Sequence, residues 1–511
     1  MMENNRLYNS IKNLLSGFLS KVLIVVLGFV VRTVFINVLG NVYLSVNGLY
    51  TNILSVLSLT ELGFGTAMLY SMYEPLAKRD YKKLSALMEL YKKVYRGVGF
   101  IVLILGLCIL PFMKYIVKNP PEIGHLTFYY IIFLMDSVLS YWLFAYKRSV
   151  LIADQKEYVC TNYHNLMIIV RSFIQVMSLI IFKNFLIYLV IQVSSTIIEN
   201  AVIAAEVNRK YPEIRRNTEL LNKTEIVAIW KNVKALTLTK LGHVVLNSTD
   251  NIIISAFIGV SWIGTLSNFT LIVDAVTGFL CQIGSSISAG LGNYFIEKSK
   301  NQSYELFKRV EFINSWLYGF CMIALLILLN PFVELWLGAR YTLSNEIVFA
   351  LAVNFFVQGY MNTLWIFRST LGLFTQGQYR PLIVAILNVA LSIIFSFRWG
   401  VAGVLIATSV SRACVNLWYD PLLLHKYGFG KPVVPFFKKY VVRITLLGLI
   451  GGNMVYMARV VFRDGVSISM FIVMLFLTLI VPNVILFIAY HRTEEFQYFW
   501  QLGKHLLKKR L

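Results

Sequence analysis

Residues 14–36 read LLSGFLSKVLIVVLGFVVRTVFI, an apolar run whose only charged residues are Lys21 and Arg32. A helix needs about 20 mostly apolar residues to cross the hydrocarbon core of a bilayer. The run is long enough to cross, and many similar runs follow it along the chain. This stretch therefore predicts a membrane-spanning helix near the start of the sequence.

The composition of the whole chain agrees with this prediction. Its 511 residues are 58% hydrophobic and only 14% charged, with a mean hydropathy of +0.68. Soluble domains are about 45–50% apolar and about 25% charged, so the chain is not a typical soluble protein. We predict an all-α polytopic membrane protein with about 14 transmembrane helices. The candidate spans are 14–36, 44–73, 94–117, 125–146, 159–182, 184–206, 235–258, 262–292, 311–335, 343–367, 381–397, 400–424, 441–462 and 466–490.

The basic residues predict the orientation of these spans. The net charge is +22, from 47 Lys and Arg against 25 Asp and Glu. With fourteen spans, one set of loops and termini holds 35 of the 47 basic residues and the opposite set holds 6. Lys and Arg are enriched in cytoplasmic loops, so we expect both termini to be cytoplasmic. No polar stretch is long enough to form a nucleic-acid-binding domain, and no nucleic-acid partner is expected.

Two basic segments outside the spans have apolar residues at helical spacing. Residues 78–94 place Leu84, Leu87, Met88 and Tyr91 between lysines. The tail 491–511 has the same pattern around Phe496 and Trp500. We expect both segments to form amphipathic helices on the inner leaflet. For the tail, a solvated charged helix is an equal alternative.

The chain also repeats itself at an offset of 219–220 residues. The matches join span n to span n+6, so each copy contains six spans and keeps the same orientation. This predicts two parallel six-helix repeats related by an axis along the membrane normal, an arrangement found in secondary transporters, plus two C-terminal helices. The matched pairs are Lys21 with Lys240, Gly40 with Gly259, Pro111 with Pro331, and Arg148 with Arg368.

The repeat sets the expected domain boundaries. Two lobes flank a polar, basic linker, and the last two spans lie outside the repeat. The expected parts are an N-lobe at 1–206 (spans 1–6), a cytoplasmic linker at 207–232, a C-lobe at 233–424 (spans 7–12), spans 13–14 at 425–490, and a basic amphipathic cytoplasmic tail at 491–511.

Two such lobes imply a central cavity that opens alternately to each side of the membrane. No span shows a run typical of a selectivity filter, which disfavours a channel. The chain contains no GxxxxGK[ST] motif, so we expect energy from an ion or substrate gradient and not from ATP. No cofactor, metal site or catalytic residue is expected.

Charged residues inside the spans are the candidate functional residues, because each costs roughly 3 kcal/mol at the bilayer centre. Lys21 and Arg32 are eleven positions apart and share one face of their helix. The repeat-equivalent span 7 carries a polar stripe, and we expect the two stripes to face each other across the cavity. Paired cations would repel a cation and attract an anion such as pyrophosphate. The candidate substrate-binding residues are Lys21, Arg32, Lys240, Arg171, Arg412, Asn247 and Asn251.

The alternative interpretation is that these charges pair internally and only hold helices together, for example Lys240 with Asp250 or Arg171 with Asp136. Asp250, on the span 7 stripe, is a candidate for coupling to H⁺ or Na⁺, and His243 on the same stripe is a second. A gate or packing role is expected for a further group near the cytoplasmic end of span 2. This group is Glu61, Gly63 and Gly65.

Five segments carry a resemblance to a known family: ELGFGTA at 61–67, LYSMYEPLA at 69–77, ALMELYKK at 86–93, STDNIIIS at 248–255 and LSNF at 266–269. They resemble the bacterial polysaccharide flippases, which translocate lipid-linked oligosaccharide repeat units. That family belongs to the multidrug/oligosaccharidyl-lipid/polysaccharide exporter superfamily. The similarity extends through most of the chain and is strongest over 14–100 and 233–300. Phe269 stands where the family more often has Tyr.

The resemblance implies a transporter that moves undecaprenyl-pyrophosphate-linked oligosaccharides across the bacterial cytoplasmic membrane, for capsule, O-antigen or exopolysaccharide assembly. It implies membrane lipids and a polysaccharide polymerase or other assembly proteins as partners. Two alternatives within the superfamily remain open, a flippase for lipid II-type peptidoglycan precursors and a multidrug/cation antiporter. A membrane-embedded glycosyltransferase or polymerase is disfavoured, because no loop carries the acidic cluster that such an enzyme needs.

Overall fold

The computed structural model describes the backbone of residues 2–58, 64–118, 123–215, 221–297, 299–373 and 376–508. Side chains are described in these ranges except at 2–11, 14, 215, 228, 231–232, 234–236, 238–245, 247, 283, 285–297, 502–503 and 505–508. The described backbone is nearly all helix and contains no strand. It divides into two compact units, 1–267 and 268–511. The lobe boundaries expected from the repeat remain a prediction.

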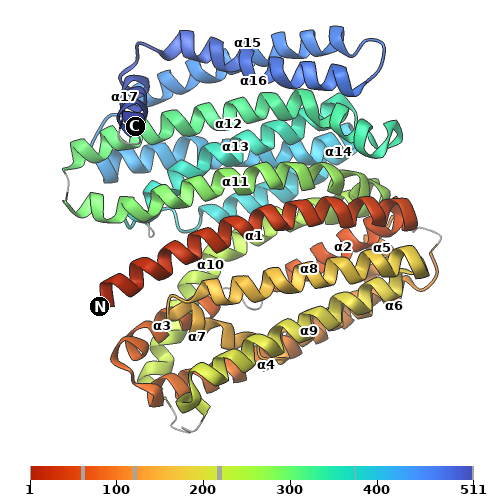
Figure 1. The fold of residues 1–511 in the computed structure, drawn as a ribbon, viewed down its shortest axis with the longest axis vertical. Coiled ribbons are helices and arrows are strands. Elements are labelled where there is room, and N and C mark those ends of the chain that lie inside the picture. The colour runs from red at the N-terminus through yellow and green to blue at the C-terminus, as the bar shows by residue number, and fades with distance from the viewer. Residues whose placement is uncertain are drawn as a thin grey trace. The chain divides into compact units, whose positions relative to one another are not determined.

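Both units consist of long helices joined by short turns (Figure 1). The helices of unit 1 are α1 (Met2–Leu39), α2 (Asn41–Leu57), α3 (Phe64–Lys78), α4 (Tyr81–Ile109), α5 (Met113–Ile116), α6 (Leu126–Trp142), α7 (Arg148–Ala153), α8 (Glu157–Phe182), α9 (Phe185–Lys210), α10 (Lys223–Ile253) and the first two turns of α11 (Ser261–Glu297). Unit 2 holds the rest of α11 with α12 (Lys300–Leu337), α13 (Asn345–Thr370), α14 (Arg380–Leu423), α15 (Val434–Val461), α16 (Ile468–Tyr490) and α17 (Glu494–Lys508).

Ten helical stretches among the described residues are long and apolar enough to span a membrane. An eleventh is added if the bent pair Leu126–Trp142 and Ala145–Ala153 is one span. The prediction of an all-α polytopic membrane protein is therefore confirmed. The count is below fourteen partly because α2 and α3, which cover the predicted span 44–73, are separated by residues outside the description, and partly because most side chains of α10 are not described.

The remaining difference lies in α14, which contains two predicted spans. Its 44 residues would extend ~66 Å as one straight helix, about twice the hydrocarbon thickness. Gly400 breaks the helix with φ 55° and ψ −135°, a conformation that only glycine adopts readily. The Asn388 amide donates to Thr408 Oγ1 at 2.9 Å across this break. Two residues twenty positions apart can meet only if the chain folds back, so α14 is a helical hairpin.

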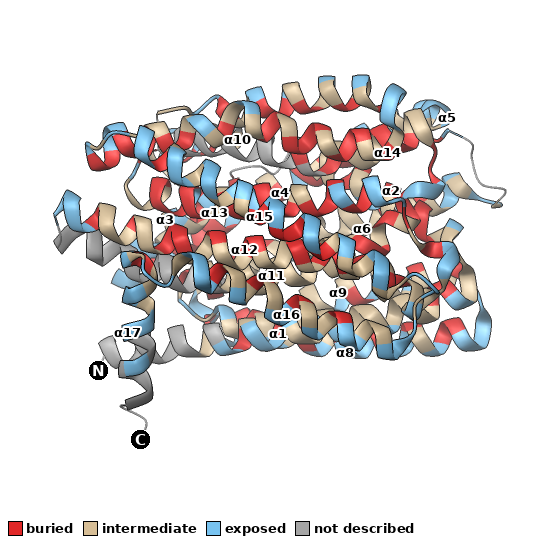
Figure 2. Cartoon of the chain, turned by 90° about the horizontal axis from the view of Figure 1, so that it is seen from above, coloured by how far each residue is buried: buried red, intermediate tan, exposed pale blue. Residues whose placement is uncertain are grey.

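The outer faces of the spans are apolar, as a lipid environment requires. Large side chains such as Phe173, Ile181, Leu449 and Ile488 are each more than 60% exposed on their helices. Figure 2 shows exposed and buried stretches along the same long helices. In water such surfaces would aggregate, whereas in a bilayer they contact acyl chains.

Within unit 1, α1 packs along α8, and α6 contacts both α4 and α9 (Figure 1). The α4–α6 contact is close because Gly106 leaves room for Leu134. A Cβ at Gly106 would lie 2.4 Å from a Leu134 methyl group. The buried Tyr130 hydroxyl donates to the Gly106 carbonyl at 3.0 Å, which fixes the register of the two helices.

The expected surface helix at 78–94 is not a separate element. It continues into the next predicted span as one helix, α4, which is ~44 Å long and so projects beyond the bilayer core. Leu84, Leu87, Met88 and Tyr91 are at most 5% exposed, and Ser85 donates to the Ile214 carbonyl at 2.7 Å. The apolar stripe therefore packs on protein and not on the inner leaflet, so that prediction was wrong.

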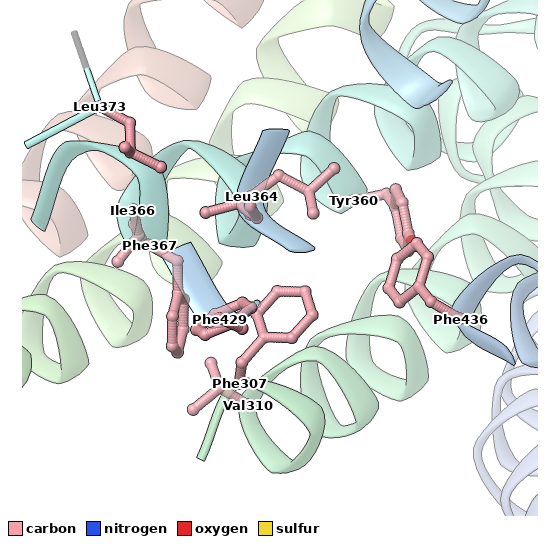
Figure 3. Packing of buried hydrophobic residues seen from close by; sticks show 10 residues of the cluster. Phe307, Val310, Tyr360, Leu364, Ile366, Phe367, Leu373, Phe429 and Phe436 are labelled. Carbon is pink, nitrogen blue, oxygen red and sulfur yellow. The ribbon is translucent and has the colours of Figure 1, made fainter. Parts of the chain in front are cut away.

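Unit 2 has its own aromatic core. Phe307 of α12 is fully buried, with Phe367 of α13 at 5.1 Å, Phe429 at 5.2 Å and Phe436 of α15 at 5.9 Å between ring centroids (Figure 3). Tyr360 of α13 extends this cluster towards α15. The cluster joins α12 and α13 to the segment that leads from the α14 hairpin to α15.

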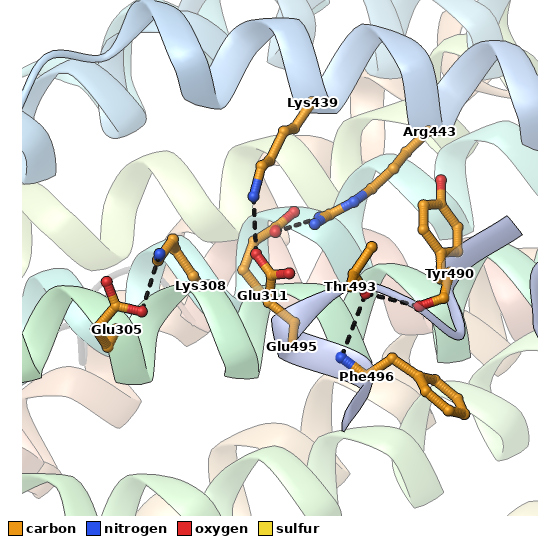
Figure 4. Close-up of polar contacts among 9 residues, drawn as sticks. All are labelled: Glu305, Lys308, Glu311, Lys439, Arg443, Tyr490, Thr493, Glu495 and Phe496. Atoms are coloured by element: carbon orange, nitrogen blue, oxygen red, sulfur yellow. Dashed lines mark hydrogen bonds and ion pairs between the residues drawn. The ribbon is translucent and has the colours of Figure 1, made fainter. Parts of the chain in front are cut away.

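The start of α17 docks onto unit 2 instead of extending away from it. Glu495 is buried and accepts a hydrogen bond from Lys439 of α15 at 2.8 Å (Figure 4). Phe496 stacks on Trp316 of α12 with ring centroids 5.9 Å apart. The Arg309 guanidinium lies 3.9 Å from the centre of the Tyr498 ring. The tail helix is therefore held by the protein over its first two turns.

Candidate substrate site

The helix that carries Lys21 and Arg32 places them differently. Lys21 is exposed on α1, whereas Arg32 is half-buried. Arg32 Nη1 donates to Ser267 Oγ of α11 at 2.6 Å, and the same hydroxyl donates to the Gly264 carbonyl at 2.7 Å. This bond gives Ser267, part of the LSNF segment quoted above, a physical role: it orients the Arg32 guanidinium.

A second cation lies near Arg32 in unit 1. Arg171 of α8 is half-buried, and the Tyr188 phenol of α9 is close enough to interact electrostatically with both arginines. The neighbouring Gln175 amide donates to the Tyr188 carbonyl at 3.3 Å, which ties α8 to α9 at this level. Two arginines from helices far apart in sequence therefore share one neighbour inside the membrane.

Lys21, Arg32 and Arg171 have no carboxylate within ion-pair distance in the part of the chain that the structure describes. The alternative pairing of Arg171 with Asp136 does not form among the described residues; Asp136 Oδ2 instead accepts from the Gln192 amide at 3.2 Å. A cation without a partner is costly at membrane depth. These three side chains therefore provide positive charge that an anionic ligand can neutralise.

Charges near the ends of the spans do have partners. Glu199 of α9 forms an ion pair with Arg148 and lies 3.0 Å from His164 Nδ1. In unit 2, Asp420 of α14 is buried between Arg380 and Arg368, and the Arg368 contact is 3.6 Å. These are structural pairs that join neighbouring helices.

Two of these pairs are related by the internal repeat. Arg148 matches Arg368 at an offset of 220, and Glu199 matches Asp420 at 221. Each arginine precedes the fifth span of its copy, and each acid lies near the end of the sixth. The repeat found in the sequence thus has a matching interaction within each unit. Arg412, a candidate for substrate binding, is 5% exposed and donates to Asn354 Oδ1 at 2.7 Å within unit 2, which favours a structural role.

The span 7 stripe is only partly described. Asp250 and Asn251 are half-buried at the end of α10. Gly65 is half-buried at the start of α3. The side chains of Lys240, His243 and Asn247, and all of Glu61 and Gly63, lie outside the described residues, so their predicted roles stay predictions.

Four residues at the α1–α2 and α10–α11 turns form a symmetric contact. Asn41 Nδ2 donates to Thr265 Oγ1 at 3.0 Å, and Ser45 Oγ donates to the Ser261 carbonyl at 3.2 Å. Residues 41 and 261 each begin their helix, so from here the offset is 220, one more than for Gly40 and Gly259, and residue 45 corresponds to 265. Each member of one pair thus corresponds to a member of the other, as expected at a two-fold axis.

This contact closes the ends of α2 and α11 against each other. Gly264 permits the close approach, because a Cβ there would lie 2.6 Å from the Asn41 carbonyl oxygen. Gly48, two turns further along α2, also permits a close approach to α11, because a Cβ there would lie 2.8 Å from an Ile263 methyl group. We call residues 41–48 and 261–265 the turn-end seal. It lies at the end of unit 1 opposite its basic loops.

At the basic end of unit 1 the structure contains a cavity of about 350 Å³ that sequence reasoning missed. It lies between α3, the start of α4 and the start of α10, and is lined by Tyr70, Tyr73, Glu74, Lys83 and Glu225 among others. The only signal in the sequence was the spacing of the first three, which falls on one helix face. The opposing residues come from segments about ten and 150 positions away, which no local pattern connects.

No family model and no curated protein matches the chain in sequence. Solved structures do match its fold. One is described as lipid II flippase MurJ in an inward closed conformation, with a TM-score of 0.64 and 15% identity over 95% of this chain and 99% of that one. Another is an inward-facing multidrug resistance transporter of the MATE family and MOP superfamily, with a TM-score of 0.62 and 13% identity over 81% and 99%.

A third structure is a point mutant of the MATE transporter VcmN from Vibrio cholerae, with a TM-score of 0.53 and 14% identity over 83% of this chain and 99% of that one. At these identities the similarity shows the fold alone. The chain therefore has a fold shared by a lipid flippase and by multidrug transporters.

Proposed function

We propose that this multi-pass membrane protein, whose fold is that of MOP-superfamily transporters, translocates undecaprenyl-pyrophosphate-linked oligosaccharide units across the bacterial cytoplasmic membrane by alternating access. Both termini would be cytoplasmic, and the product would feed capsule, O-antigen or exopolysaccharide assembly. The observation that carries the proposal is the set of Lys21, Arg32 and Arg171, cations at membrane depth without carboxylate partners in the described structure.

This charge favours an anionic head group over a cationic drug. Arg presents planar donors that fit phosphate oxygens, and Ser267 holds Arg32 in one orientation. A drug/cation antiporter would need an excess of acidic residues here, whereas Lys21, Arg32 and Arg171 supply three positive charges. The pyrophosphate would therefore bind near α1 and α8 while the polyprenyl tail remains in lipid.

The extent of the fold matches also supports a lipid substrate. The match to the lipid II flippase covers 95% of the chain and the match to the MATE transporter covers 81%. The difference is about 70 residues, close to the length of the C-terminal segment 425–490. We infer that the additional matched residues are spans 13 and 14, which this chain would then share with the flippase and not with the drug transporter.

The test is to replace Arg32 with Ala and with Lys and to measure surface polysaccharide at matched expression. We expect a loss of more than tenfold for Arg32→Ala and a partial loss for Arg32→Lys, which keeps the charge but not the paired donors. Arg459→Ala, in the exposed face of α15, is the matched control and should have no effect. Wild-type polysaccharide in Arg32→Ala would contradict the proposal.

Coupling to H⁺ or Na⁺ through Asp250, with His243 as the second candidate, is a separate part of the proposal. Asp250→Asn should abolish the dependence of transport on the ion gradient while leaving substrate binding intact. The coupling role would be refuted if collapse of the ion gradient reduces transport to the same extent in wild type and in Asp250→Asn.

The specific alternative is a lipid II-type flippase, which the MurJ-like fold favours. Depletion of the protein distinguishes the two, because the lipid-linked intermediate that accumulates on the inner leaflet identifies the substrate. Accumulation of a peptidoglycan precursor would show that the substrate is a lipid II-type precursor and not a lipid-linked oligosaccharide. Accumulation of a repeat-unit oligosaccharide would support it, together with lost surface polymer and intact cell wall.

A further inference from the structure

The cavity of about 350 Å³ at the basic end of unit 1 has a lining unlike the surroundings of Arg32 and Arg171. Its α3 wall carries Tyr70, Tyr73 and Glu74 at positions i, i+3 and i+4 of one helix face. Tyr70 is 70% exposed and Tyr73 is 46% exposed. Their rings meet edge to face with centroids 6.3 Å apart. Two large aromatic rings thus remain open to whatever occupies the cavity.

The opposite wall comes from α4 and α10. Lys83 Nζ of α4 lies 2.9 Å from Glu225 Oε1 of α10, while the other oxygen of Glu225 accepts from the Asn222 backbone at 3.2 Å. Leu87 and Ile229 supply an apolar floor. The position of Glu225 is therefore fixed from two sides, which makes this wall a preformed surface.

Each carboxylate in the cavity already has a cation. Lys78 lies 2.7 Å from Glu74, and its hydrogen bond holds the pKa of the Glu74 carboxyl below its ordinary value. Lys83 does the same for the pKa of the Glu225 carboxyl. Both acids are therefore ionised acceptors at neutral pH, and the cavity combines acceptors and donors without a strong excess of either charge.

We propose that this cavity is a binding subsite for a neutral sugar residue of the transported lipid-linked oligosaccharide. The proposal rests on the proposed function. Tyrosine rings pack against the apolar C–H faces of sugar rings, while ionised carboxylates and an ammonium bond the hydroxyls at the rim. Its volume is at the lower end of the range of about 300–1,000 Å³ for small-molecule sites, which leaves room for a sugar but not for a polyprenyl chain.

Other ligand classes fit less well. A phosphate would gain a cation only by displacing Glu74 or Glu225 from its lysine. An organic cation would be attracted by the rings and carboxylates, but it would have to displace Lys78 and Lys83 from their pairs. A neutral polyol needs neither displacement, because hydroxyl groups both donate and accept.

The subsite also fits the position of the cavity on the expected cytoplasmic side, where the sugar is when the lipid-linked unit is delivered. The pyrophosphate would bind deeper, at Arg32, and the sugar at the rim. Two chemically distinct sites would thus recognise two parts of one substrate. This division predicts that binding at one site can be abolished by mutation without loss of binding at the other.

The test uses purified full-length protein and two probes. One is undecaprenyl pyrophosphate, and the other is the lipid-linked oligosaccharide that accumulates in cells depleted of the protein. We expect wild type to bind the glycosylated probe more tightly. Tyr70→Ala and Tyr73→Ala should each lower affinity for that probe roughly tenfold, about the value of one good aromatic contact, and leave affinity for undecaprenyl pyrophosphate unchanged.

Controls separate the two proposals. Tyr70→Phe should retain the preference because it keeps the ring, and Tyr427→Ala, an exposed tyrosine of unit 2, should behave as wild type. Arg32→Ala should lower the affinity for both probes to the same extent. If Tyr70→Ala keeps the preference for the glycosylated probe, the subsite is refuted while the proposed function stands. If wild type binds neither probe, the proposed function fails. Tyr70-dependent binding of tetraphenylphosphonium without a sugar preference would assign the cavity to organic cations instead.

Discussion

At the scale of single residues, charged side chains in the spans and at their ends differ in whether they form ion pairs. Glu199, Glu311 and Asp420 each pair with arginine, so their charges hold helices together. Lys21, Arg32 and Arg171 lack such a partner among the described residues. The sequence shows both groups only as charges in or beside apolar spans. Only the pairing separates the structural residues from the candidate functional ones.

The Glu311–Arg443 pair provides a prediction about stability. Glu311 of α12 and Arg443 of α15 are 6% and 11% exposed, and Ser315 also donates to Glu311 at 2.9 Å (Figure 4). Removing one member of a buried pair leaves the other uncompensated and costs about 3–5 kcal/mol. Glu311→Leu should therefore lower the melting temperature of the purified protein sharply, while Glu311→Leu with Arg443→Met should recover most of the loss.

Glu89→Gln is the matched control for that experiment. Glu89 pairs with Lys92 at 3.4 Å on the exposed face of α4, where an ion pair contributes ~0–1 kcal/mol. Its melting temperature should stay close to that of wild type. If Glu311→Leu also leaves the melting temperature close to that of wild type, the Glu311–Arg443 pair does not hold α15 against α12.

At the scale of elements, the turn-end seal depends on a glycine. Gly264→Ala would place a methyl group 2.6 Å from the Asn41 backbone oxygen and 2.5 Å from Ser45 Oγ, so α2 and α11 would have to separate. We expect a state more open at this end. With Ser267→Cys in both proteins, a membrane-impermeant thiol reagent should label the Gly264→Ala protein several-fold faster.

Gly97→Ala serves as the control, because a Cβ at Gly97 of α4 meets nothing within 4 Å. It should leave the labelling rate of the introduced cysteine unchanged. Equal rates in all three proteins would mean that the seal does not limit access to this part of α11.

The docking of α17 should depend on pH through Glu495. Burial opposes ionisation of this carboxyl, but its hydrogen bond and attraction to Lys439 outweigh that effect and hold its pKa below the ordinary value. The folded protein therefore binds fewer protons than the unfolded chain, and the stabilisation is present above the unfolded pKa of about 4.3 and lost as pH falls below it. Glu495→Gln should be less stable than wild type at pH 7, and the difference should disappear near pH 3.

At this scale the sequence predicts some features and not others. Hydropathy located all ten helical stretches that are long and apolar enough to span among the described residues, because span length is set by bilayer thickness. It could not show that α4 runs unbroken through residues 81–109, since an amphipathic stripe looks the same whether it packs on lipid or on protein. The cavity beside Tyr70 could not be predicted from the sequence either, because its walls come from three separate segments. The repeat located Arg148 and Arg368 as equivalents, but their partners Glu199 and Asp420 became visible only in the structure.

At the scale of the whole molecule, the distribution of basic residues leads to a prediction about topology. Of the 47 Lys and Arg, 35 belong to one set of predicted loops and termini and 6 to the other. Each basic residue near an anionic inner leaflet gains about 1 kcal/mol, so the inverted orientation would be strongly disfavoured. We therefore expect Lys82 and Lys210 to face the cytoplasm and Arg340 and Arg463 to face outward.

Single cysteines at these four positions, in a background without the five native cysteines, test this in intact cells. An impermeant thiol reagent should label Arg340→Cys and Arg463→Cys from outside, and should label Lys82→Cys and Lys210→Cys only after permeabilisation. The four positions sample both units, with Lys82 and Lys210 in unit 1 and the two arginines in unit 2. The reverse pattern would invert the protein and place the cavity beside Tyr70 outside, where it could bind a released sugar but not an incoming one. External labelling of only one arginine would instead show that a span between 341 and 462 was wrongly assigned, because Arg340 and Arg463 can share a side only if an even number of spans separates them.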